Sequence, residues 1–176
     1  MAVNRRTALK QFLFVSAGVA ILPACLQEDT SKSSMLLKNF QLSGQQEKTL
    51  EELTETILPA TATPGAKAVY AHLFVLKMLD DCYKKEDQQK FISGLAQFEK
   101  ETKQKYNQPF AQCSKAQRDE MAAGINAKKD GKDDLAFFYS TTKRLTIQGY
   151  STSKFYLSNV QVYKMIPGKY KGCVPA

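Results

Sequence analysis

The sequence predicts an all-α protein, a single compact domain of about five to six helices with an extended C-terminal tail. Apolar residues recur at three- and four-residue intervals, the spacing of amphipathic helices, through most of the chain. Stretches rich in proline, glycine and polar residues separate these periodic segments. No alternation of apolar and polar residues is long enough to predict a useful strand. We therefore expect the domain to be mostly or wholly helical.

The first 24 residues have the composition of an export signal. Arg5 and Arg6 precede Leu9 and Lys10 in a pattern similar to the twin-arginine motif, and an uncharged run follows over residues 11–25. That run is too short and too weakly apolar for a permanent span of a bilayer about 30 Å thick. The alternative, a buried N-terminal helix in a cytosolic protein, leaves the basic flank unexplained. We expect export to the periplasm.

The signal ends in a sequence similar to a bacterial lipobox, Leu22-Pro23-Ala24-Cys25. Lipidation of Cys25 would make the protein a membrane-anchored lipoprotein, and ordinary cleavage after Ala24 is the alternative. Residues 25–41 are predicted to be a polar tether, because the stretch 26–34 offers little to pack. The helical domain is expected over residues 42–176.

Size and charge limit the function further. Without the signal the chain keeps 152 residues (176 minus 24), enough for one domain with a sizeable core. The formal charge is +8, of which the signal contributes three, so the remainder is mildly basic at +5. Its lysines are scattered among acidic residues and accompany no nucleic-acid-binding motif. No nucleic-acid partner is predicted.

The first helix of the domain is expected to start at Ser43, since Ser43 and Gln46 have the spacing of a capping box. Its apolar positions are Leu50, Leu53, Ile57 and Leu58, and Pro59 ends it. Residues 59–66 contain two prolines and a glycine, which predicts a fixed, non-helical turn.

A second helix is predicted within residues 66–83. Its apolar residues cover more than one face, so we expect it to be the central helix. His72, the single histidine of the chain, is predicted to be a buried structural residue, because it lacks the partners that a metal site or a catalytic triad needs. Asp80 and Asp81 are adjacent and point about 100° apart on a helix, so we expect helix-end solvation or an ion pair rather than chemistry.

Three or four further helical segments follow. An amphipathic helix is predicted over residues 86–107, and Ser114 with Gln117 has capping-box spacing before a shorter helix at 115–129. Asp134 is expected to cap a helix that continues through residues 135–148, and Gly149 to end or kink it. Residues 150–163 form another possible helix, and residues 164–176 a tail that lies extended over a surface.

The motifs of common catalytic and cofactor sites do not occur in the sequence. There is no glycine-rich nucleotide motif, no G-x-S-x-G and no H-E-x-x-H, so we expect no catalytic, cofactor-binding or metal-binding residue in this chain. Cys82, Cys113 and Cys173 remain after the signal, which allows one disulfide in an oxidising compartment. Three pairings are open, and none has the C-x-x-C spacing of a redox or zinc site.

The order of the segments resembles the gluconate 2-dehydrogenase subunit 3 family. The similarity extends from about Leu42 to the C-terminus, after an arginine-pair signal. Its most telling parts are residues 57–59 with 63–65, and residues 149–150 with 152–153.

The resemblance implies a non-catalytic accessory subunit that binds, stabilises and co-exports a flavin-dependent sugar or sugar-acid dehydrogenase of the glucose-methanol-choline type. FAD would then reside in that partner, and haem c in a third subunit, a cytochrome c. The resemblance also implies that the segment from Tyr150 to Tyr170 packs on the flavoprotein and that Cys82 pairs with Cys173. The expected interface residues are Tyr150, Thr152, Ser153, Phe155, Tyr156, Tyr163, Pro167 and Tyr170. A free-standing exported helical lipoprotein that binds a ligand or acts as a scaffold is the alternative.

Overall fold

The computed structural model describes residues 33–127 and 133–161, together with residues 163, 164, 166 and 168. Contacts divide the chain into two units, and the described residues all belong to the second, Ser31–Ala176. The signal residues Arg5, Arg6, Leu9 and Lys10, the lipidation candidate Cys25, and also Pro167, Tyr170 and Cys173, lie outside the described residues.

Five α-helices and two short helical turns make up the described part of the chain, which contains no strand. They are α2 (Gly44–Ile57), α3 (Ala71–Cys82), α4 (Lys85–Tyr106), the 3₁₀ turn η2 (Phe110–Gln112), α5 (Lys115–Ala127), α6 (Asp134–Ser151) and the π-helical turn η3 (Tyr156–Val160). The prediction of an all-α domain is confirmed.

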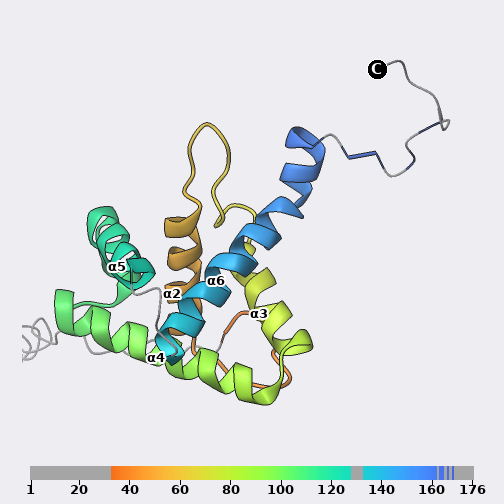
Figure 1. Cartoon of the computed structure of the whole chain (residues 1–176). Helices are drawn as coiled ribbons and strands as arrows, with labels where there is room; N and C mark the ends of the chain where they lie inside the picture. Colours follow the sequence, from red (N-terminus) through yellow and green to blue (C-terminus); the bar gives the residue numbers. More distant parts are fainter. Residues whose placement is uncertain (1–32, 128–132, 162, 165, 167, 169–176) are drawn as a thin grey trace, which may run out of the picture. The chain divides into compact units, whose positions relative to one another are not determined.

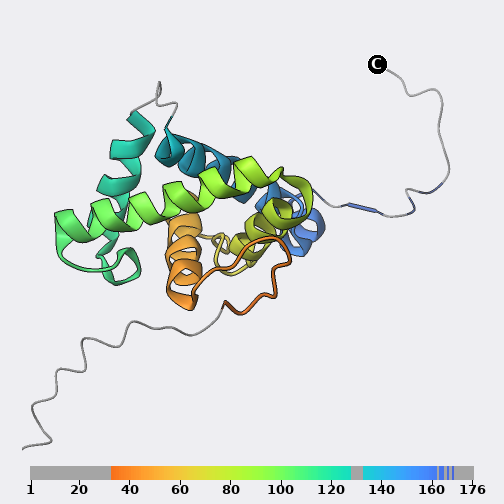
Figure 2. The same ribbon diagram turned by 90° about the horizontal axis from the view of Figure 1, so that it is seen from below.

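The central helix is α6, which contacts α2, α3, α4 and α5. In Figure 1, α4 runs along the bottom and α6 rises from it past α2 and α3; Figure 2 shows the same crossing after a quarter turn. The expectation that the second helix, α3, is central was therefore wrong. Three threonines of α6, Thr141, Thr142 and Thr146, are buried against the neighbouring helices. The number of apolar residues in α6 is therefore smaller than the number of its buried residues, and the sequence did not indicate that it is the central helix.

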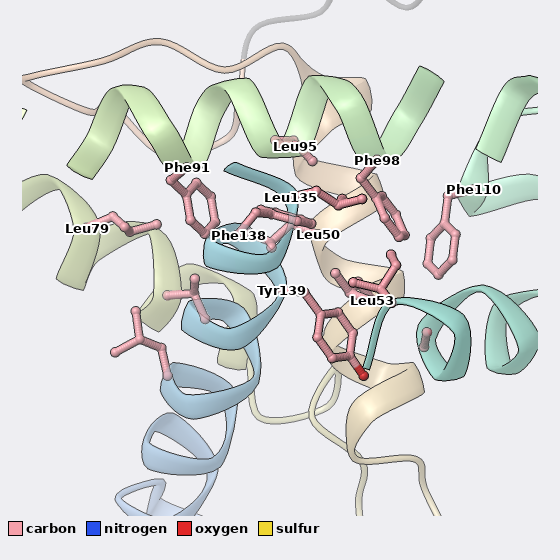
Figure 3. Close-up of a cluster of buried hydrophobic side chains, with 14 of the residues drawn as sticks. Leu50, Leu53, Leu79, Phe91, Leu95, Phe98, Phe110, Leu135, Phe138 and Tyr139 are labelled. Atoms are coloured by element: carbon pink, nitrogen blue, oxygen red, sulfur yellow. The ribbon is translucent and has the colours of Figure 1, made fainter. Parts of the chain in front are cut away.

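Four phenylalanines form the middle of the core where α4 meets α6 and η2 (Figure 3). The ring centroids of Phe91 and Phe138 are 4.9 Å apart, and those of Phe98 and Phe110 are 4.8 Å apart, both edge to face. Gly94 lies between Phe91 and Phe98 on α4, and a Cβ there would be 2.1 Å from the backbone oxygen of Asp134. The helices can therefore cross this closely only without a side chain at that position.

The capping residues explain where the helices begin. Both predicted capping boxes are present: Ser43 and Gln46 exchange hydrogen bonds of 3.2 and 3.0 Å, and Ser114 and Gln117 exchange bonds of 3.4 and 2.9 Å. The predicted cap of α6 was one residue off. Asp133 accepts a hydrogen bond from the backbone N–H of Ala136, while Asp134 is the first residue within the helix.

Two predicted boundaries around α3 and α6 also need correction. Helix α3 begins at Ala71, because residues 66–70 form turns and Tyr70 has a left-handed backbone with φ of 55°. Of the two expectations for Gly149, that it ends the helix was wrong, because α6 continues through it to Ser151. A Cβ at position 149 would lie 2.9 Å from Cδ1 of Phe74, so this glycine permits close packing of α3 against α6.

The packed domain begins earlier than the predicted boundary at Leu42. Residues Met35, Leu37 and Phe40 are partly buried against the core, within the segment expected to be a free tether. Figure 2 shows this segment as an irregular path leading into α2. The prediction rested on the polar stretch 26–34, whereas the apolar residues of this segment, at 35–37 and 40, follow that stretch. Residues 33–41 are thus part of the fold.

The close approach at Gly94 predicts opposite effects for two glycine substitutions. We expect Gly94→Ala to lower the free energy of unfolding by about 1–3 kcal/mol, because the new methyl group collides with the backbone of α6. Gly124→Ala on α5 is the matched control: nothing lies within 4 Å of its Cβ position, so we expect stabilisation of up to about 1 kcal/mol. Urea denaturation of the purified variants measures both; equal effects would contradict this account of the crossing.

Candidate partner-binding surface

Aromatic side chains gather where the chain leaves α6. The ring of Tyr150 contacts those of Phe155 and Tyr156, with centroids 6.4 and 6.0 Å apart. The hydroxyl of Ser153 accepts a hydrogen bond from the backbone N–H of Tyr156, which turns the chain from α6 into η3. The structure therefore brings together three of the aromatic residues expected at an interface.

The other predicted interface residues have different surroundings. The hydroxyl of Thr152 donates to the backbone oxygen of Gln148, so it serves the end of α6. The side chain of Tyr163 is 62% exposed. Val160 and Ile166, which were not predicted, are also exposed. Their exposure could not be read from the sequence, because it depends on where η3 lies.

Exposed apolar side chains are concentrated in this part of the chain. Among the described residues, the exposed large hydrophobic side chains are Leu36, Tyr70, Ile147, Val160, Tyr163 and Ile166. Four of these six lie between residues 147 and 166. We call the exposed residues Ile147, Val160, Tyr163 and Ile166 the C-terminal surface.

The connection between α2 and α3 packs beside this end of α6. The hydroxyl of Tyr150 donates a hydrogen bond of 2.9 Å to the backbone oxygen of Pro64, and Phe74 lies against Gly149. Tyr70, at the end of the same connection, is 65% exposed. Residues 59–70 are therefore a spatial neighbour of the end of α6, although Pro64 and Tyr150 are 86 positions apart in sequence.

His72 is buried, as predicted, with 5% of its surface exposed. Its Nε2 lies 4.0 Å from a carboxylate oxygen of Glu47, and its Nδ1 has no hydrogen-bond partner. Burial lowers the pKa of His72, and the nearby carboxylates of Glu51 and Glu47 offset only part of this effect. The neutral imidazole is thus favoured at neutral pH, as suits a structural role.

Asp80 and Asp81 have separate roles. Asp81 forms an exposed ion pair of 2.8 Å with Lys77, one of the two roles expected. Asp80 is 2% exposed and accepts hydrogen bonds from the backbone N–H groups of Lys38 (2.9 Å) and Asn39 (2.8 Å). Burial raises the pKa of Asp80, but these hydrogen bonds more than offset that effect and hold it below its ordinary value. Asp80 thus fixes the N-terminal segment to the end of α3.

The two described cysteines are not joined to each other. Cys82 is exposed at the end of α3, whereas Cys113 is buried. The predicted partner of Cys82, Cys173, lies outside the described residues, so that disulfide stays a prediction.

The described part of the chain contains neither a metal-binding cluster nor a membrane-spanning helix. Within residues 33–127, 133–161 and the four single positions beyond, no group of three His, Cys, Asp or Glu residues is placed to hold a metal ion. In the same residues, every helix is too short or too polar to span a bilayer.

These features define a small all-α domain that exposes aromatic and aliphatic side chains on the last turns of its last long helix and beyond it. Residues 44–168 match the family described as gluconate 2-dehydrogenase subunit 3, and the chain belongs to this family. The family recognised in the sequence is thereby confirmed. No curated protein and no solved structure matches the chain.

The role of Asp80 predicts a pH-dependent stability. At neutral pH we expect Asp80→Asn to lower the free energy of unfolding by about 1–3 kcal/mol, since it weakens charge-assisted hydrogen bonds. Because folding lowers the pKa of Asp80, its stabilisation is complete above the ordinary aspartate value of about 4 and is lost as the pH falls through the folded-state pKa. The difference between parent and variant should therefore shrink below about pH 4.

Denaturation curves recorded at several pH values measure this difference. Asp81→Asn is the control, and its exposed ion pair should contribute less than about 0.5 kcal/mol. An Asp80→Asn variant as stable as Asp81→Asn at neutral pH would show that the N-terminal segment is held by other contacts.

Proposed function

We propose that this chain is a non-catalytic accessory subunit that binds and stabilises a flavin-dependent sugar or sugar-acid dehydrogenase. The match of residues 44–168 to gluconate 2-dehydrogenase subunit 3 is the observation on which the proposal rests. In this proposal the partner is a flavoprotein of the glucose-methanol-choline type that holds FAD, and a cytochrome c with haem c can complete the complex. The chain itself contributes a binding surface.

The C-terminal surface supports this proposal. Its side chains are aliphatic or aromatic and remain exposed in the isolated chain, with Ile166 83% and Tyr163 62% accessible. Tyrosine is enriched at protein interfaces because it adds a large contact area at a small cost in side-chain entropy. The aromatic cluster of Tyr150, Phe155 and Tyr156 connects η3, which ends at Val160, to the last turn of α6. A partner that covers the surface would remove its apolar side chains from water.

Export of the partner is the second element of the proposal. The flavoprotein takes up FAD and folds in the cytoplasm, so it needs a route for folded proteins. The accessory chain supplies the twin-arginine signal with Arg5 and Arg6 and takes the partner across the membrane with it. Lipidation of Cys25 then anchors the complex on the periplasmic side.

Co-purification tests the binding proposal. We expect a full-length copy with a C-terminal tag on a flexible spacer to bring down a flavoprotein, seen as flavin absorbance and identified by mass spectrometry. The double variant Tyr163→Ala and Ile166→Ala should bind at least about tenfold more weakly, because it removes about 1–2 kcal/mol or more of interface contacts. Leu36→Ala is the control, since Leu36 is exposed but precedes α2.

A colourless protein that purifies alone, under conditions that preserve complexes, would contradict the subunit proposal. It would favour the free-standing exported lipoprotein instead.

The export proposal predicts a shared fate for the two chains. We expect Arg5→Lys with Arg6→Lys to leave both this chain and the flavoprotein in the cytoplasm, as cell fractionation and immunoblotting would show. Cys25→Ala should still be exported but should lose labelling by a radioactive fatty acid. Arrival of the flavoprotein in the periplasm of the double-lysine strain would contradict co-export, and equal labelling of Cys25→Ala and the parent would contradict lipidation at Cys25.

A further inference from the structure

The connection between α2 and α3 is exposed at its tip and firmly held at its base. Residues 59–63 are exposed. One carboxylate oxygen of Glu55 accepts a hydrogen bond from the backbone N–H of Ala60 (2.9 Å), within this stretch, and the other accepts from the N–H of Lys67 (2.8 Å), after it. One side chain of α2 therefore joins both ends of this loop.

Other contacts complete the support. The backbone N–H of Ala66 donates to the oxygen of Leu58 at 2.9 Å, and the N–H of Thr61 donates to the oxygen of Thr63 at 2.9 Å. The hydroxyl of Tyr150, on α6, donates a hydrogen bond to the backbone oxygen of Pro64. Figure 1 shows the loop extending beyond α2, at the end of the domain away from α4.

Gly65 allows the carboxylate of Glu55 to reach into the loop. A Cβ at this position would be 2.3 Å from an oxygen of Glu55 and 2.6 Å from the backbone nitrogen of Ala60. The prediction of a fixed, non-helical turn over residues 59–66 thus has a specific cause: the glycine, two prolines and a bridging carboxylate act together.

Charged groups near the loop are engaged at its base. The ammonium group of Lys67 pairs with Glu51 (3.2 Å) and Glu52 (2.7 Å), and Arg118 of α5 also pairs with Glu52. The tip itself consists of five uncharged residues, Pro-Ala-Thr-Ala-Thr. A preformed, uncharged loop loses little conformational entropy and little charge solvation when another protein covers it.

Tyr70 extends the same surface. Its left-handed backbone is unusual for a residue with a side chain and costs about 1 kcal/mol or more. Two backbone hydrogen bonds of 3.0 Å hold that conformation. The N–H of Tyr70 donates to the oxygen of Lys67, and the oxygen of Tyr70 accepts from the N–H of Leu73. Despite this unusual backbone conformation, Tyr70 is not buried and remains 65% exposed. An exposed tyrosine on a fixed backbone is suited to anchor a protein contact.

We propose that residues 59–66 and Tyr70 form a second, preformed contact for the flavoprotein subunit. This inference rests on the proposed function, and it assigns part of that binding to a segment far from the C-terminal surface in sequence. The hydrogen bond between Tyr150 and Pro64 makes the loop continuous with the end of α6, so one partner can cover both. The loop surface fits a protein because it offers backbone groups, small side chains and one tyrosine, without a basic patch for nucleic acid.

Site-specific photo-crosslinking tests this contact in the assembled complex. A photoreactive benzoylphenylalanine at Ala62, in the exposed tip, should yield a covalent product with the flavoprotein after irradiation. The matched control is the same residue at Ala96, which is exposed on α4 and should give no such product. Ala62→Arg should also lower the recovery of flavoprotein at least tenfold, while Ala96→Arg leaves it unchanged and both variants keep the parent's melting temperature.

The outcomes separate the two proposals. If the parent chain brings down flavoprotein, but position 62 gives no crosslink and Ala62→Arg binds normally, the loop contact is wrong and the subunit proposal stands. If crosslinking or loss of binding is equal at positions 62 and 96, the loop is not a specific contact. If the parent chain brings down no flavoprotein, both proposals fail together.

Discussion

The position of α6 in the domain depends on its close crossing with α4 at Gly94. Without a side chain at that position, the first turn of α6 lies directly on α4, and Phe91, Phe98 and Phe138 fill the space on either side. The crossing fixes the direction in which α6 leaves the core. Since α6 has 18 residues and rises about 1.5 Å per residue, its end lies about 27 Å from its start. The candidate surface is therefore held by a helix that is anchored in the core.

Helix α6 joins that core to the exposed elements through a sequence of specific contacts. The ring of Phe74 on α3 packs against Gly149, where a side chain would collide with it. The hydroxyl of the next residue, Tyr150, donates a hydrogen bond to the backbone oxygen of Pro64 in the loop after α2. Beyond this point, Tyr150 also packs on Phe155 and Tyr156. One short stretch of α6 thus positions both the loop and the start of the C-terminal surface. A partner that recognises both would meet a loop that is already held by Glu55 and Tyr150, which lowers the entropy cost of ordering that loop on binding.

Local sequence signals predicted the helices well, and long-range contacts explain what they missed. Capping residues and apolar spacing located α2, α4 and α5. The burial of Thr142 and Thr146 could not be predicted, because threonine is often exposed and only the neighbouring helices enclose these two. Asp80 accepts hydrogen bonds from the backbone N–H groups of Lys38 and Asn39, which are about 40 positions away, so no local sequence pattern indicates these bonds. In the candidate surface, Tyr150, Phe155 and Tyr156 were named from the sequence as interface residues, which stays a prediction, whereas the exposed Tyr70 depends on a backbone conformation that favours glycine.

Hydrogen–deuterium exchange of the free chain and of its complex with the flavoprotein tests the central claim most directly, since it reports which backbone segments the partner covers. Our account predicts that binding slows exchange in residues 59–70 and 147–161, with little change in α4 and α5. Protection confined to α4 and α5, with unchanged exchange around the loop and the end of α6, would contradict it.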